Sequence, residues 1–132
     1  TSFIKDMSSE TPNVETFIFV QKNINKYQLY IDITSKALKN KMIEVNITLK
    51  FQHKETQLKR SYFEIIYAVA VKIDESIQEK KDLEKIVLCD VPNSVVSDIE
   101  KSFTDMMQNS GFPNIKLEKK IDFTKLYLER FN

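Results

Sequence analysis

Hydrophobic and polar residues alternate along two segments of the chain, residues 27–34 and 42–52. From Ile43 to Phe51, every second position is isoleucine, valine, leucine or phenylalanine, and the positions between them are polar. A period of two in a stretch rich in β-branched residues is typical of a strand with one buried face. Because only residues 36–41 form the linker, we expect the two strands to pair as a hairpin.

A third and longer run, residues 60–73, is apolar on both faces. Phe63 and Ile65 lie on one face of this predicted strand, and Ile66 shares the other face with Glu64 and two alanines. Strands buried on both faces belong in the middle of a packed assembly. We therefore expect the second face to be covered by a helix or by another subunit.

The N-terminal part gives a weaker pattern. Residues 2–10 predict a short strand that ends at the turn signal Pro12-Asn13. Residues 16–20 either extend this strand or begin a covering loop, and residues 21–26 are polar and loop-like.

The hydrophobic period changes towards the C-terminus. Residues 76–86 are charged and predict a helix or a loop. Asp90, Pro92 and Asn93 are typical of a helix start, and Gly111 with Pro113 beyond it is typical of a helix end. Between these signals, apolar residues recur at helical spacing along residues 93–109, at Val95, Val96, Ile99, Phe103, Met106 and Met107.

A last, short helix is predicted after Asp122, which can cap its N-terminus. Phe123, Leu126 and Tyr127 share one side of it. The order of elements predicts an α+β fold, with a four-stranded antiparallel sheet and both helices packed on one side of it. Without a repeat or a linker-like boundary, residues 1–132 are expected to form a single domain.

Composition excludes several kinds of chemistry. The chain has one glycine, one histidine and one cysteine. Phosphate-binding loops need several glycines, and zinc clusters or catalytic triads need histidine or cysteine, so we expect no metal, no cofactor and no enzymatic activity. His53 is expected in a solvated turn, and Cys89, among apolar neighbours, as a small core residue.

Charge and hydropathy narrow the class further. The net charge is +1, and the 20 Lys and Arg residues are spread along the chain, which argues against a nucleic-acid-binding protein. No run approaches the roughly 20 apolar residues of a membrane-spanning helix. Residues from Thr1 onward lack both a signal peptide and an initiator Met, so we expect a cytosolic protein with a few residues before Thr1.

Three segments carry more specific motifs. They are KDMSSETPN at residues 5–13, SYFEIIYAVAV at residues 61–71, and VPNSVVSDIEKSFTDMMQNSGFPNIKLEKKIDFTKLYL at residues 91–128. The most specific part is the linker Phe112-Pro113 followed by Asp122-Phe123-x-x-Leu126-Tyr127. In this order, the segments resemble the first strand, the fourth strand, and the long helix, linker and C-terminal helix of the SecB export chaperones.

The resemblance implies a function and an assembly. SecB proteins are ATP-independent chaperones of the bacterial cytoplasm that hold secretory precursors unfolded and deliver them to the SecA motor. They form a homotetramer, a dimer of dimers in which the long helices pack between two sheets. The expected partners are thus unfolded preproteins, SecA and three further copies of the chain, with no nucleic acid and no direct membrane insertion.

The resemblance also implies site residues. Acidic side chains on the flat face of the sheet would dock SecA, at Asp6, Glu10 and Glu64. The apolar stripe of the long helix would form the oligomer interface, at Val95, Val96, Ile99, Phe103 and Met106. A client groove would be lined by Tyr27, Leu29, Ile31, Phe63, Ile65, Phe123, Leu126 and Tyr127.

Two other readings remain open from the sequence. One is a SecB-like chaperone dedicated to another client, such as an antitoxin. The other is a small-ligand carrier with a pocket between its sheet and its helices. A tetramer that binds SecA would favour export over both.

Overall fold

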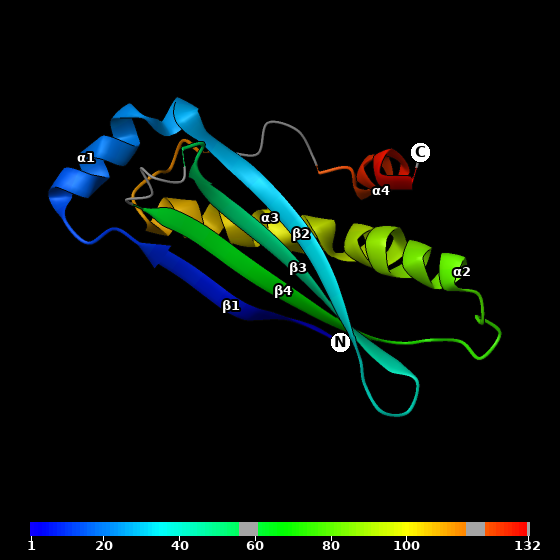
Figure 1. The fold of residues 1–132 in the computed structure, drawn as a ribbon. Coiled ribbons are helices and arrows are strands. Elements are labelled where there is room, and N and C mark those ends of the chain that lie inside the picture. Colours follow the sequence, from blue (N-terminus) through cyan, green and yellow to red (C-terminus); the bar gives the residue numbers. More distant parts are fainter. Residues whose placement is uncertain (56–60, 116–120, 132) are drawn as a thin grey trace.

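Four strands pair into one antiparallel sheet in the order β1-β4-β3-β2 (Figure 1). The structure is a computed structural model and describes residues 1–55, 61–115 and 121–131. Residue 60 of the third predicted strand and residues 116–120 of the SecB-like segment lie outside this range. The bounds of the strands, which confirm the predicted sheet and hairpin, are β1 Ser2–Glu10, β2 Tyr27–Ala37, β3 Met42–His53 and β4 Tyr62–Lys72.

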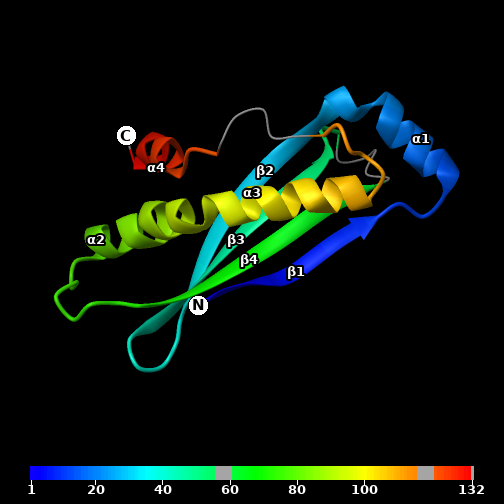
Figure 2. The same ribbon diagram turned by 180° about the vertical axis from the view of Figure 1, so that it is seen from behind.

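The register of the sheet puts one apolar set of side chains on a single face. Phe51 of β3 lies opposite both Leu29 of β2 and Phe63 of β4. Directly paired residues point to the same side of a sheet. We call this side the inner face, because the helices cover it, and the opposite side the outer face (Figure 2).

Residues 80–85 are helical, one of the two structures expected for residues 76–86, and the helix continues through the predicted start at Asp90. Helix α2 (Lys80–Lys85), the π-helical segment η3 (Ile86–Asp90) and helix α3 (Val91–Asn109) follow one another without a loop. Pro92 lacks the N–H of a regular helical turn and its ring crowds the preceding turn, so the wider π-turn upstream accommodates it. Asp90 and Pro92 therefore mark a change of helical pitch within a longer helix.

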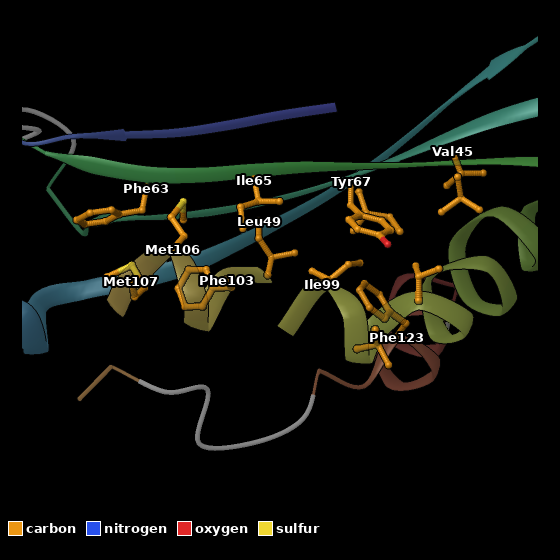
Figure 3. Packing of buried hydrophobic residues seen from close by; sticks show 14 of the residues in the cluster. Val45, Leu49, Phe63, Ile65, Tyr67, Ile99, Phe103, Met106, Met107 and Phe123 are labelled. Carbon is orange, nitrogen blue, oxygen red and sulfur yellow. The ribbon is translucent and has the colours of Figure 1, made fainter. Parts of the chain in front are cut away.

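The core lies between α3 and the inner faces of β3 and β4. Figure 3 shows Phe103 and Ile99 pointing from the helix towards Leu49 and Ile65. Each of these four side chains is at most 1% exposed. Cys89 is a free, buried cysteine, as the sequence predicted.

Residues 16–20 form neither a strand nor a loop, so that prediction was wrong. They lie in helix α1 (Val14–Lys22), which is followed by the short 3₁₀ helix η1 (Ile24–Lys26). The Asn13 side chain caps α1 by accepting the Thr16 N–H at 2.8 Å. Thr16 and Val20, one helical turn apart, are its buried residues.

His53 is buried, which corrects the expectation of a solvated turn. It ends β3 and is only 3% exposed. Its ring stacks on Phe19 of α1, and its Nδ1 accepts the N–H of Glu55 at 3.0 Å. The unexpected helix α1 supplies this cover.

Gly111 ends α3 as the sequence predicted. Its φ is +98°, and the N–H groups of Gly111 and Phe112 donate to the carbonyls of Gln108 and Met107. This pair of bonds is the Schellman motif. The Phe112 ring then stacks on Phe17 of α1 with 5.0 Å between ring centroids.

We expect Gly111→Ala to lower the free energy of unfolding by about 2 kcal/mol, because alanine is strained at positive φ. A Cβ atom at this position would also lie 2.7 Å from Cε2 of Phe17. Urea denaturation measures the change. Gln108→Ala, at an exposed position in the same turn, is the control and should change the value by less than about 0.5 kcal/mol. Equal effects of the two changes would contradict the assignment.

Candidate client groove and partner-docking face

A groove runs along the inner side of β2. A cavity of about 340 Å³ lies between β2, the π-helical segment and helix α4 (Phe123–Phe131). Its lining is mostly apolar and consists of Leu29, Tyr30, Ile31, Asp32, Ile33, Leu88, Leu126 and Tyr127.

A second cavity of about 360 Å³ continues the first one towards α2. The two share Ile33 and Leu88, so together they form one trough along β2. The far end of the trough is more polar, because Lys80 and Glu84 form part of its rim.

The trough follows an unpaired strand edge. In the part of the chain that the structure describes, β2 pairs only with β3. The bonds Lys54 N–H to Lys26 carbonyl (2.9 Å) and Leu38 N–H to Met42 carbonyl (2.8 Å) show that even-numbered residues of β2 bond to β3. In an antiparallel pair the intervening residues point their backbone groups away from the partner.

It follows that Leu29, Ile31 and Ile33 each contribute both a side chain and backbone hydrogen-bonding groups to the trough. Their side chains lie on the inner face and line the cavities. Their backbone N–H and C=O groups point to the free edge of β2. An extended chain at this edge could therefore find apolar contacts and backbone hydrogen-bonding groups at the same residues.

The structure divides the predicted groove residues into two sets. Leu29, Ile31, Leu126 and Tyr127 line the groove. The other predicted residues, Tyr27, Phe63, Ile65 and Phe123, are buried in the core. Leu88 and Ile33 were missed. The alternation of β2 extends to Ile33 and could have indicated it, whereas the place of Leu88 depends on the π-turn.

Tyr27 illustrates the buried set. It is 6% exposed, and its hydroxyl donates to the carbonyl of Ser61 at 3.1 Å. Burial raises the pKa of this hydroxyl above 10.0, since the phenolate would lose its hydration.

Helix α4 is anchored at its N-terminal end. Phe123 is fully buried, and Asp122 Oδ1 caps the helix by accepting the Lys125 N–H at 3.0 Å. Asn93 Nδ2 of α3 donates to Thr124 Oγ1 at 2.9 Å. One turn further on, Leu126 is 41% exposed and forms a wall of the groove.

The residues predicted for the oligomer interface are buried in the chain's own hydrophobic core. None of them is more than 8% exposed: Val95, Val96, Ile99, Phe103 and Met106. Exposed apolar residues lie instead on β1, at the other edge of the sheet. Phe3, Ile4 and Met7 are 47%, 43% and 54% exposed.

The predicted docking acids share the outer face. Glu64 lies opposite Ser8, and Asp6 and Glu10 flank Ser8 at two-residue spacing on β1. Ser8 Oγ donates to Asp6 Oδ2 at 3.0 Å. From the other side, Lys50 Nζ of β3 lies 3.8 Å from Glu64 Oε2.

A second ion pair crosses the opposite end of the outer face. A bulge between Ile4 and Asp6 shifts the register of β1, and Lys5 Nζ reaches Glu44 Oε2 of β3 at 2.8 Å. Because β4 lies between these strands, Lys5 must pass over it, where Ala68 and Ala70 present small side chains to the outer face. The hydrogen bond from Lys5 and a second one from Asn46 hold the pKa of Glu44 below 4.5.

We expect Lys5→Ala to raise the pKa of Glu44 towards 4.5, measured by NMR titration of its carboxylate carbon. A depressed folded-state pKa means that this pair stabilises the fold above the unfolded pKa, and that the contribution is lost as the pH falls through the folded value. Lys36→Ala, a change at the position paired with Glu44, is the control and should give a smaller shift, because Lys36 acts on Glu44 only by a weaker Coulombic attraction. An unchanged pKa in Lys5→Ala would contradict the assignment.

Comparison with known proteins identifies the family. A family model described as SecB, preprotein translocase subunit SecB, matches residues 1–132. The chain belongs to the SecB family. Membership gives it a SecB-type chaperone role in protein export, as the resemblance predicted. Among the described residues, no helix is long and apolar enough to cross a bilayer, and no cluster of acids, His or Cys could hold a metal ion.

Individual relatives agree with this family. The chain is 55% identical over 131 residues to a putative protein-export protein SecB of Pelagibacter ubique, covering 99% of this chain and 94% of that protein. It is 23% identical to the protein-export protein SecB of Rhodospirillum centenum, covering 95% and 73%.

A solved structure shows the same fold. It is a SecB-like chaperone of Mycobacterium tuberculosis in complex with a ChAD peptide from an antitoxin, with a TM-score of 0.63. The match covers 90% of this chain and 87% of that one at 11% identity.

Proposed function

We propose that the chain is an ATP-independent holdase of the bacterial cytoplasm that binds extended segments of unfolded preproteins along β2 and delivers them to SecA. The observation that carries this proposal is the apolar trough beside the free edge of β2. No enzymatic activity forms part of the proposal.

The trough suits an unfolded guest because it combines two sources of affinity. Burial of apolar surface contributes about 25 cal/mol per Å², without requiring a particular sequence. An extended segment that adds to a strand edge gains main-chain hydrogen bonds, which are also independent of sequence. A folded protein offers neither, since its apolar residues are buried and its backbone groups are already paired.

The odd-numbered residues of β2 direct their backbone groups to the free edge, and this predicts how an unfolded guest chain would bind. In an antiparallel addition, guest residues opposite Leu29, Ile31 and Ile33 would exchange both backbone hydrogen bonds with β2. The side chains of the same guest residues would point to the inner face, towards Leu88 and Leu126. A segment with an apolar residue at every second position should therefore bind best.

We expect Leu126→Gln to weaken binding of an unfolded preprotein about tenfold and to reduce its delay of preprotein refolding without nucleotide, because a leucine contact of this size is worth about 1–2 kcal/mol. Leu128→Gln is the matched control, since Leu128 is 49% exposed on the same helix but does not line the groove. The proposal fails if the unchanged protein does not delay refolding, or if both variants lose equal affinity.

Amide methylation tests the binding mode. The probe is a short peptide with leucine at every second position and threonine between, and its affinity is measured by fluorescence anisotropy. We expect methylation of the leucine amide nitrogens to abolish binding, because these N–H groups would donate to β2. Methylation of the threonine amides should be tolerated. The opposite result would contradict antiparallel addition, and equal effects would contradict strand addition altogether.

Assembly into a tetramer is part of the proposal. Among the described residues, β1 pairs only with β4, and its side chains Phe3, Ile4 and Met7 are exposed. These features support contact between copies, because an open apolar strand edge favours association with another chain. We expect light scattering to give four chain masses, and Met7→Glu to lower the mass. A monomeric wild-type protein would contradict this part.

Binding of SecA separates export from service to a dedicated client. We propose that Asp6, Glu10 and Glu64 receive SecA on the outer face, away from the groove. A SecB-like chaperone that holds guests but does not bind SecA would instead fit a dedicated client, such as the antitoxin peptide bound by the Mycobacterium tuberculosis protein.

A further inference from the structure

We propose that Lys50 forms an ion pair with Glu64 and that a cationic partner has to displace Lys50 from it. Lys50 thereby sets the strength of docking on the outer face. This inference rests on the docking part of the proposed function. The partner is a protein surface with two or more cationic side chains, and its binding exchanges one ion pair for another.

The position of Lys50 follows from the sheet register. Lys50 of β3 lies directly opposite both Tyr30 of β2 and Glu64 of β4. All three side chains, and Ser8 of β1 beyond them, therefore form one row across the outer face. Asp6, Glu10 and Glu64 form the acidic end of this face, and Lys50 lies on β3, the next strand after Glu64.

Two contacts hold the Lys50 side chain in place. Its Nζ lies 3.8 Å from Glu64 Oε2 and 5.3 Å from the centroid of the Tyr62 ring. The Lys50 and Glu64 side chains are 28% and 22% exposed, much less than the Lys41–Glu75 pair at 59% and 82%. Reduced exposure weakens solvent screening, and the Tyr62 ring adds a cation–π attraction.

The other two acids differ from Glu64. Asp6 and Glu10 lie on the edge strand, are exposed, and have no cation within ion-pairing distance among the described residues. They are about 13 Å apart, since a strand rises by about 3.3 Å per residue. The outer face thus offers two available carboxylates on β1 and a third that Lys50 already holds.

Three other lysines of this face do not compete in the same way. Lys5, Lys36 and Lys72 lie at the opposite end of the sheet, towards the β2–β3 turn. Lys5 is engaged with Glu44. Lys26 and Lys54 lie at the Glu10 end, just past β2 and β3, and Lys54 is four residues along the chain from Lys50. Lys50 is therefore the lysine that an approaching basic surface meets directly opposite Glu64, where like charges oppose association.

Removal of Lys50 should strengthen docking. The probe is purified SecA, and its dissociation constant is measured by isothermal titration calorimetry at low and at physiological salt. We expect Lys50→Gln to bind SecA about fivefold more tightly at low salt, with a steeper loss of affinity as salt increases. Lys50→Arg keeps the charge and should bind like the unchanged protein.

Lys72→Gln is the matched control. This change also removes one positive charge from the outer face of the sheet, but Lys72 lies eight residues from Glu64 along β4. It should change SecA affinity by less than about twofold, because the charges are separated by more than a Debye length. Equal strengthening by the two changes would show a net-charge effect and overturn the inference, as would weaker binding of Lys50→Gln.

A double-mutant cycle tests the displacement itself. Glu64→Gln should cost little SecA affinity while Lys50 is present, and about fivefold more in the Lys50→Gln background. Additive effects would overturn the inference and leave docking intact. If no variant binds SecA although refolding of preproteins is still delayed, then docking fails and this inference fails with it, while the holdase function stands.

Discussion

Helix α3, the main cover of the inner face (Figure 2), is only about half as wide as the sheet. Four strands at about 4.8 Å spacing span roughly 19 Å, whereas a helix with its side chains is about 10–12 Å across. Helix α3 therefore buries only the middle of the inner face. Phe63, Ile65 and Leu49 of the central strands have no exposed surface, but the inner-face residues of both edge strands retain some.

The two margins of the inner face that α3 does not cover, at β2 and at β1, differ in their surroundings. On the β2 side, α4 and the π-helical segment stand beside the edge and leave the trough between them. On the β1 side only the C-terminal end of α3 approaches the strand, at Met106, Asn109 and Ser110, and Met7 remains 54% exposed. The same shortage of cover thus explains both the proposed groove for guests and the proposed contact between copies.

Local patterns predicted most of the fold. Alternation located the strands within a few residues, and Gly111 and Asp122 marked helix ends because backbone geometry depends directly on these residue types. Helix α1 was missed because its apolar run FIFV fits a strand as well as a helix, and only burial of Thr16 and Val20 one turn apart separates the two. The burial of His53 followed from that same missed helix.

The groove was predicted only in part for a related reason. Alternation assigns a residue to a face, but it does not tell whether the face is covered at that point. Leu29 and Phe63 lie in one row of the inner face, yet α3 covers Phe63 and leaves Leu29 at the margin. The residues predicted on one side of α4 also differ in burial: Phe123 is buried and anchors the helix, whereas Leu126 faces the trough.

The outer face shows that a chain with almost no net charge can still have an acidic end. The chain carries a net charge of only +1. At physiological salt, charges more than about 8 Å apart are largely screened, so a partner responds to local groups rather than to the total. Lysines at the far end of the sheet add to that total without opposing a cation beside Asp6 or Glu10. A chain close to neutrality can therefore keep the acidic end that we propose for docking, because Lys50, the lysine opposite Glu64, is already held by Glu64 and Tyr62.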